Sequence, residues 1–308
     1  MDDRLLTRLA CPLPGCRGRL AGDPRGSARA AVLRCRRCRA PYPVLGGIPI
    51  LVPDPAGYLA SFHDAVLASL AEAGRASRDA VRLVADFAAA APAQDRMRFG
   101  DDWVAAEVRG TSAPLPADAP PELAALLALA RRDPPHRQLL ALGGGHRFGA
   151  TVEVGPGAGV LTAELRRRAS SVLVLDLSLR SVLLTLRRAR RGRGSPVAGV
   201  VADAADLPLA SRRARTIVAA HVIDLLESPA DFVGAVAAAL PPGGRLLLST
   251  PAPHHGDPDG DPRTLDRLLS RAGLRVEKTR DGVPWLREHG PRHVEIYVVR
   301  LVCAAHPR

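Results

Sequence analysis

The sequence is poor in lysine, in aromatic residues and in long apolar runs. Its 308 residues include a single lysine, Lys278, and only 3% of them are aromatic. No apolar run reaches the roughly 18 residues of a membrane-spanning helix, so we expect no membrane partner. The first residues, Met1 to Leu6, lack the basic start and long apolar centre of a signal peptide. We therefore expect a cytoplasmic protein whose core is filled by leucine, valine and alanine.

The net charge of +12 comes almost entirely from arginine. Because alanine, glycine and proline are also abundant, this bias resembles a genomic base composition more than selection for a partner. The clearest basic run, residues 187–193, ends a predicted helix, where cations suit the helix dipole. Contact with RNA is the other interpretation of the same run. The positive excess favours acidic partners or anionic acceptors.

The segment from Val152 to Val160 reads as a buried strand, a glycine loop and the start of a helix. Glycine tolerates the positive φ of so tight a turn and leaves bare backbone for a ligand. A dinucleotide-binding loop would place its third glycine at position 160, but that glycine is Gly159 here. The loop spacing therefore does not support recognition of a pyrophosphate.

Two acidic residues follow apolar runs at the places that a nucleoside requires. Asp176 ends the run 172–175 and lies 21 positions after Gly155 (176 − 155), close to the roughly 20 expected of a ribose-binding carboxylate. Asp203 follows the run 197–201. Together with the glycine loop, these residues predict a site for an adenosine-bearing cofactor in a parallel α/β sheet.

Residues 151–303 resemble a class I S-adenosylmethionine-dependent methyltransferase of the ubiquinone-biosynthesis type. Besides Asp176, the segments 153–159, 203–209, 221–229 and 240–248 carry the likeness. The resemblance implies a Rossmann-like α/β fold, with a seven-stranded sheet, an antiparallel final strand and helices on both faces. It also implies a set of cofactor-binding residues: Glu153, Gly155, Gly157, Gly159, Asp176, Leu177, Asp203 and Ala204.

The resemblance implies methyl transfer by in-line displacement, in which the protein orients the acceptor and, if needed, removes its proton. His221 is the catalytic candidate: it either acts as a base or only lines the pocket. Trp285 and His289 either line the acceptor pocket or pack. His254 and His255 lie in a segment rich in proline and glycine, which favours a solvated loop over a metal site.

Four of the five cysteines form two pairs near the amino terminus, Cys11 with Cys16 and Cys35 with Cys38. This spacing is typical of a tetrahedral zinc site, and a reducing compartment favours zinc over disulfides. Loss of the metal and redox-active thiols are the alternatives. Four thiolate ligands leave no open position, so the predicted zinc is structural.

Residues 40–51 and the opening 5–12 resemble a small zinc-ribbon family. That family includes the activator subunit shared by eukaryotic tRNA and release-factor methyltransferases, as well as extensions fused to bacterial methyltransferases. The first cysteine pair of this chain is two residues wider than the family pattern. A segment of some 50 residues has too small a hydrophobic core to fold alone without a stabilising metal site.

Three units are predicted: a zinc-ribbon-like β domain at 1–54, a helical connector and lid at 55–150, and a methyltransferase domain at 151–308. Helical spacing from Tyr58 to Ala91 predicts two helices split at Gly74, and 110–121 reads as a linker or exposed loop before a further helix at 122–131. In the last unit we expect strands near 151–154, 172–176, 197–201, 216–220, 245–250, 274–279 and 294–302, and helices at 159–169, 179–191, 229–240 and 262–272.

Three hypotheses for function follow. The first is a methyltransferase acting on an unidentified small-molecule acceptor. The second is an RNA methyltransferase that uses the zinc ribbon and the basic surface, whose RNA binding should weaken steeply with salt. The third is a non-catalytic binding or scaffold protein. It is suggested by Ala214-Arg215, where the family usually has Phe-Asp, and by Leu225, where the family has a second histidine.

Overall fold

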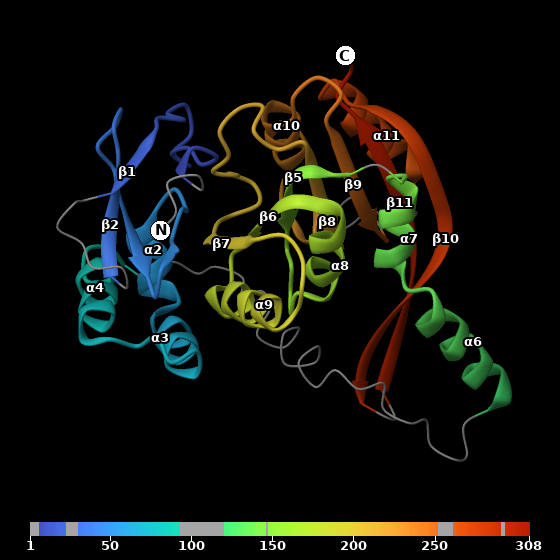
Figure 1. Ribbon diagram of the computed structural model, residues 1–308, viewed down its shortest axis with the longest axis horizontal. Helices are drawn as coiled ribbons and strands as arrows, with labels where there is room; N and C mark the ends of the chain where they lie inside the picture. Colours follow the sequence, from blue (N-terminus) through green and yellow to red (C-terminus); the bar gives the residue numbers. More distant parts are fainter. Residues whose placement is uncertain (1–5, 23–29, 93–119, 146, 252–260, 291–292) are drawn as a thin grey trace.

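The computed structural model describes residues 6–22, 30–92, 120–145, 147–251, 261–290 and 293–308. These residues form a four-stranded antiparallel sheet near the amino terminus and a seven-stranded mixed sheet covered by helices (Figure 1). The predicted fold class is thereby confirmed. Most of the predicted linker at 110–121 lies outside the described residues, as do His254 and His255.

The large sheet has the strand order β10-β11-β9-β8-β5-β6-β7. Its parallel strands are nearly continuous apolar runs, as strands buried on both faces require. They are β5 (Gly149–Val154), β6 (Ala169–Asp176), β7 (Val197–Val201), β8 (Thr216–Ala220) and β9 (Arg245–Thr250). The final strand β11 (His293–Ala305) runs antiparallel to both of its neighbours, β9 and β10 (Arg275–Gly290), as predicted.

Helices cover both faces of this sheet. Val152 and Val154 of β5 belong to one hydrophobic cluster, together with Phe232 of α10 (Pro229–Ala239) and residues of α11 (Pro262–Arg271). Val172 and Val174 of β6 belong to a second cluster, together with residues of α7 (Pro135–Leu142), α8 (Val160–Arg168) and α9 (Leu179–Arg191). The alternation of side chains along each strand therefore builds two cores, one on each face.

The last two strands are longer than predicted. β10 has 16 residues and pairs with β11 from Arg275↔Ala305 to Gly290↔His293. The prediction ended the first of them at 279. The structure instead places a register irregularity there, between Arg280 and Val283, and pairing resumes beyond it. Trp285, expected between two strands, therefore lies within β10.

The small sheet covers the β7 edge of the large one. It consists of β1 (Leu20–Gly22), β2 (Ala30–Cys35), β3 (Pro41–Leu45) and β4 (Ile48–Pro49). Ile50 forms a parallel bridge with Val201 of the edge strand β7, and the Leu51 N–H donates to the Val201 carbonyl over 2.8 Å. Leu9 and Tyr42 share a hydrophobic cluster with Leu207. The two sheets thus share one core, and the β7 edge, which could otherwise pair with another strand, is covered.

The remaining helices form two groups (Figure 1). Three of them, α2 (Pro55–Ser61), α3 (His63–Glu72) and α4 (Arg78–Ala88), contact one another, and within this group α4 contacts β2 and β3 while α3 contacts α9. The prediction of two helices here was wrong, because the chain also breaks at Phe62. At the other end, α6 (Pro121–Arg132) and α7 lie against β10. Among the described residues, no helix is long and apolar enough to cross a membrane.

The sequence did not predict α7. Pro134-Pro135 resembles a helix breaker, but proline is favoured at the first position of a helix, where its missing N–H is not needed. Pro135 takes that position in α7, and the helix ends at Leu142.

Candidate cofactor and acceptor site

The glycine loop joins β5 to α8 with a backbone that only glycine adopts easily. Gly155, Gly157 and Gly159 have φ values of +68°, +53° and +79°. A Cβ on Gly155 would lie 2.5 Å from Val222, and one on Gly159 would lie 2.9 Å from the Cα of Thr185. The loop therefore needs glycine for both conformation and space, and it presents bare backbone at the end of β5.

Glu153 is the buried acid at this edge. It is only 1% exposed, and its Oε2 accepts a hydrogen bond of 2.6 Å from the Thr162 hydroxyl of α8. A buried carboxylate requires such polar contacts. The bond connects the end of β5 to α8, the helix that follows the loop. Glu153 also lines the cavity described below.

Asp176 is the last residue of β6, and Asp203 lies two residues beyond the end of the neighbouring strand β7. Each carboxylate accepts a 2.9 Å bond from a backbone N–H two residues later, that of Ser178 and that of Ala205. The Ala202 N–H donates to the Asp176 carbonyl over 3.0 Å, which brings the two strand ends together. The structure therefore brings the predicted residues of three adjacent strands to the carboxyl edge of the sheet, where ligands of such folds bind.

A cavity of about 260 Å³ opens beside the glycine loop. Gly155 and Gly157 form one wall, and His221 and Trp285 form another. Two helices complete it: the predicted α6, with Ala130 and Arg131, and the start of α7, which the sequence did not predict, with Pro134, Pro135 and His136. The side chain of His289 lies outside the described residues.

His221 is held firmly in this cavity. Its φ of +55° is strained for a residue with a side chain, and its N–H donates to the Ser249 carbonyl over 2.9 Å. The imidazole stacks on the Trp285 ring, with centroids 3.7 Å apart and planes 3° from parallel. Burial, helped by the charge of His136, lowers the pKa of His221 to about 3. The ring is therefore neutral at physiological pH.

The lining of the cavity includes an ion pair and a histidine that contacts a carboxylate. Arg131 of α6 and Glu288 of β10 form a two-point ion pair, with contacts of 3.0 and 2.9 Å. His136 Nε2 lies 3.6 Å from Glu164 Oε1, and burial lowers the pKa of His136. Sequence reasoning missed these residues, and the only signal for His136 was the proline pair that begins α7.

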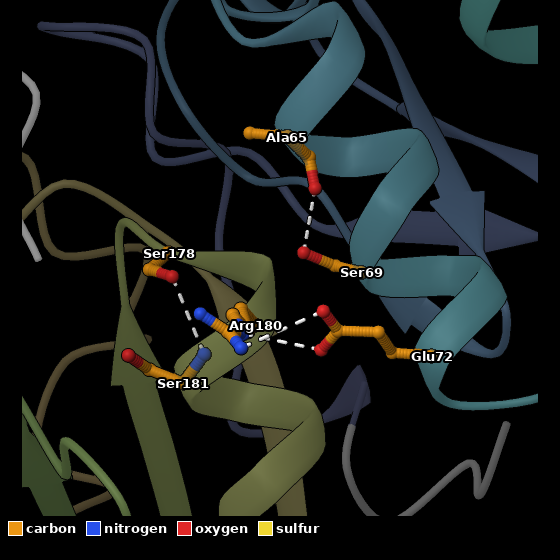
Figure 2. Close-up of polar contacts among 6 residues, drawn as sticks. All are labelled: Ala65, Ser69, Glu72, Ser178, Arg180 and Ser181. Carbon is orange, nitrogen blue, oxygen red and sulfur yellow. Dashed lines mark hydrogen bonds and ion pairs between the residues drawn. The ribbon is translucent and has the colours of Figure 1, made fainter. Parts of the chain in front are cut away.

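A second cavity, of about 430 Å³, lies between α2–α3 and the start of α9. Its polar groups contact one another or their own helices (Figure 2): the Ser69 hydroxyl donates to the Ala65 carbonyl, and Arg180 pairs with Glu72 at 3.2 Å. Leu177, the residue after Asp176, lines this cavity. The cavity therefore adjoins the ribose end of the predicted cofactor site.

The four cysteines of the small sheet meet at one point, and their sulfur atoms all lie within 4.8 Å of one another. Cys11 and Cys38 are 3.7 Å apart, and Cys16 and Cys35 are 3.6 Å apart. Tetrahedral thiolates at the usual zinc–sulfur distance lie roughly 3.8 Å from one another. The cluster could therefore hold a metal ion, and its spacing suits zinc.

The departures from the family pattern lie in different places. Ala214 and Arg215 precede β8, where the Arg215 N–H donates to the Ala150 carbonyl over 2.8 Å. This is the amino edge of the sheet, opposite the glycine loop. Leu225 ends a short 3-10 helix, η1 (Ile223–Leu225), after β8. Ala214-Arg215 therefore carries no evidence of a damaged cofactor pocket.

Comparison with known proteins supports the assignment of the larger domain. Residues 152–248 match the model of the methyltransferase domain family, and this stretch contains the glycine loop, Asp176, Asp203 and His221. The chain therefore contains a methyltransferase domain of the S-adenosylmethionine-dependent type. Trp285, which lines the cavity beside the glycine loop, lies outside the matched residues.

The amino-terminal part has a relative of its own. A stretch of 59 residues, 19% of the chain, is 46% identical to the UPF0434 protein Bpet2671 of Bordetella petrii and covers 87% of that protein. This match fits the zinc-ribbon-like domain, which therefore belongs to the UPF0434 family.

Two solved structures illustrate the more distant similarity. The N-methyltransferase NodS from Bradyrhizobium japonicum, in complex with S-adenosyl-L-homocysteine, is 19% identical, with a TM-score of 0.47 and coverage of 67% of this chain and 99% of NodS. The complex of the Haloferax volcanii methyltransferase activator Trm112 with a methyltransferase is 16% identical, with a TM-score of 0.45 and coverage of 59% and 93%. The assignment rests on the domain match rather than on these similarities.

Proposed function

We propose that this methyltransferase acts on a small-molecule acceptor bound in the cavity beside His221 and Trp285. The observation that supports the proposal is that the glycine loop and the Trp285–His221 stack line the same cavity. Methyl donor and acceptor would meet there. A volume of about 260 Å³ is small for a ligand pocket, which favours a compact acceptor or the reactive end of a larger one.

The proposed cofactor contacts follow the carboxyl edge of the sheet. The ribose would lie against Asp176 and Leu177, the adenine against Asp203 and Ala204, and the amino-acid end against Glu153 and the glycine loop. S-adenosylmethionine supplies an already activated methyl group, so the chain mainly has to orient the acceptor. Neutral His221 can accept a hydrogen bond from the acceptor. Its low pKa makes it a weak base, which suits an acceptor that is nucleophilic already or loses its proton easily.

We also propose that Cys11, Cys16, Cys35 and Cys38 hold a structural zinc ion, and that the chain divides into a ribbon at 1–54, a connector at 55–150 and a catalytic unit at 151–308. Four protein thiolates leave no open position for metal catalysis. Because ribbon residues share a hydrophobic cluster with residues that follow β7, the ion would also stabilise the edge of the methyltransferase sheet.

Methyl transfer into fractionated cell extract tests the acceptor class. With methyl-labelled S-adenosylmethionine, we expect label in the small-molecule fraction. Trp285→Ala should abolish this transfer without abolishing cofactor binding, whereas Val298→Ala, at an exposed position of the next strand, should leave it intact. Label in the RNA fraction that disappears steeply with salt would support an RNA methyltransferase instead. Cofactor binding with no label in any fraction would support a non-catalytic protein.

A further inference from the structure

Tyr58 is a buried residue of α2 whose hydroxyl reaches the cofactor edge of the large sheet. Its side chain is 2% exposed, and its hydroxyl donates a hydrogen bond of 2.8 Å to the carbonyl of Leu177. Leu177 directly follows Asp176, the proposed ribose ligand. A helix from the connector therefore holds the peptide beside this carboxylate.

The Leu177 carbonyl belongs to a peptide unit that makes a second hydrogen bond. Its other end is the N–H of Ser178, which donates to the Asp176 carboxylate over 2.9 Å. A peptide unit is planar, so a rotation that breaks the bond to Tyr58 also turns the N–H away from Asp176. Bonds in such a chain also polarise and strengthen one another. The tyrosine hydroxyl and the aspartate carboxylate are thus connected through one rigid group.

Tyr58 itself is well anchored. Asp54 caps α2 by accepting a 3.0 Å bond from the Gly57 N–H, and the ring of Tyr58 packs on that of Phe62 with centroids 5.0 Å apart. A few residues earlier, Leu51 is bonded to Val201 at the end of β7. The helix that carries the hydroxyl is therefore fixed to the same strand ends that form the site.

We propose that Tyr58 is a positioning residue for the cofactor. Its hydroxyl fixes the Leu177–Ser178 peptide and thereby holds the Asp176 carboxylate in the orientation that accepts the ribose hydroxyls. The inference rests on the proposed function, because it requires Asp176 to bind the ribose. The connector would thus contribute to cofactor affinity through Tyr58, although Tyr58 itself does not contact the cofactor.

The test is a double-mutant cycle on the full-length protein, read as the Kd for S-adenosylhomocysteine by calorimetry. Tyr58→Phe should weaken binding roughly 3- to 10-fold, the worth of one buried hydrogen bond. Asp176→Ala should weaken it roughly 10-fold or more. In the Asp176→Ala background, Tyr58→Phe should have no further effect, because the group that it positions is gone. Ser61→Ala is the matched control, since it removes another hydroxyl of α2 that bonds within its own helix.

A second readout does not depend on binding. In the ligand-free protein, Tyr58→Phe should speed hydrogen exchange at the Ser178 amide, and Ser61→Ala should not. Wild-type affinity in Tyr58→Phe overturns the inference alone, as does an equal loss with and without Asp176. Wild-type affinity in Asp176→Ala overturns both the inference and the proposed cofactor site.

Discussion

Replacing Gly155 with alanine should destabilise the protein because two separate costs meet at that residue. At φ +68°, a residue with a Cβ costs about 1–2 kcal/mol in the left-handed region. The new Cβ would also lie 2.5 Å from Cγ2 of the buried Val222, and such overpacking costs about 1–3 kcal/mol. We expect Gly155→Ala to lower the free energy of unfolding by about 2–5 kcal/mol.

The two costs can be separated by also replacing Val222 with alanine. The Val222 Cβ lies 3.9 Å from the position of the new Cβ, an ordinary contact, so only the branched methyl clashes. In a double-mutant cycle measured by chemical denaturation, Val222→Ala should recover about 1–3 kcal/mol and leave the conformational cost in place.

Gly234→Ala is the matched control for this cycle. Gly234 lies within α10, and a Cβ there meets nothing within 4 Å. Alanine should therefore stabilise the protein slightly, as it does in most helices. A Gly155→Ala protein as stable as wild type, or one that Val222→Ala does not rescue, would refute the account of the loop.

Two further predictions concern pH and the metal. The pKa of His221 falls from 6.5 to about 3 on folding, so the unfolded chain binds this proton more readily. The contribution of His221 to the free energy of unfolding should be fully present above pH 6.5 and should decrease as the pH falls toward 3. In acid titrations of unfolding, His221→Asn should make this decrease smaller than in wild type. Removing the metal with a chelator should lower the unfolding midpoint of the whole chain, because Cys11 and Cys35 lie in the cluster that contains Leu207. Elemental analysis should find one zinc per chain, lost in Cys35→Ser; an unchanged midpoint after metal loss would contradict the shared core.

The parallel strands were the most predictable part of the fold. β7, β8 and β9 have the predicted bounds, because short apolar runs such as 216–220, alternating with helical segments, are typical of parallel strands buried on both faces. The positions of the acidic residues at the ends of β6 and β7 could be predicted for the same reason, since the carboxyl ends of parallel strands lie at one edge of the sheet. Their placement next to the glycine loop could therefore be predicted, but their roles stay proposals.

The proposed acceptor side of the site could not be predicted in the same way. Its residues come from α6, α7 and β10, which are far apart in the chain and meet only in the folded protein. The Arg131–Glu288 pair spans 157 residues, and no periodic pattern links its partners. The hydrogen bond from Tyr58 to Leu177, which joins residues 119 positions apart, could not be predicted from the sequence either.

Calorimetric titration with S-adenosylmethionine would show whether Asp176 and the glycine loop bind this cofactor. We expect saturable binding that weakens by about 1–3 kcal/mol in Asp176→Ala, because a charge-assisted hydrogen bond is lost. Asp86→Ala, which removes an exposed carboxylate of α4, should bind as wild type does. No binding by folded, zinc-loaded protein, or equal binding by Asp176→Ala, would contradict the proposed cofactor site.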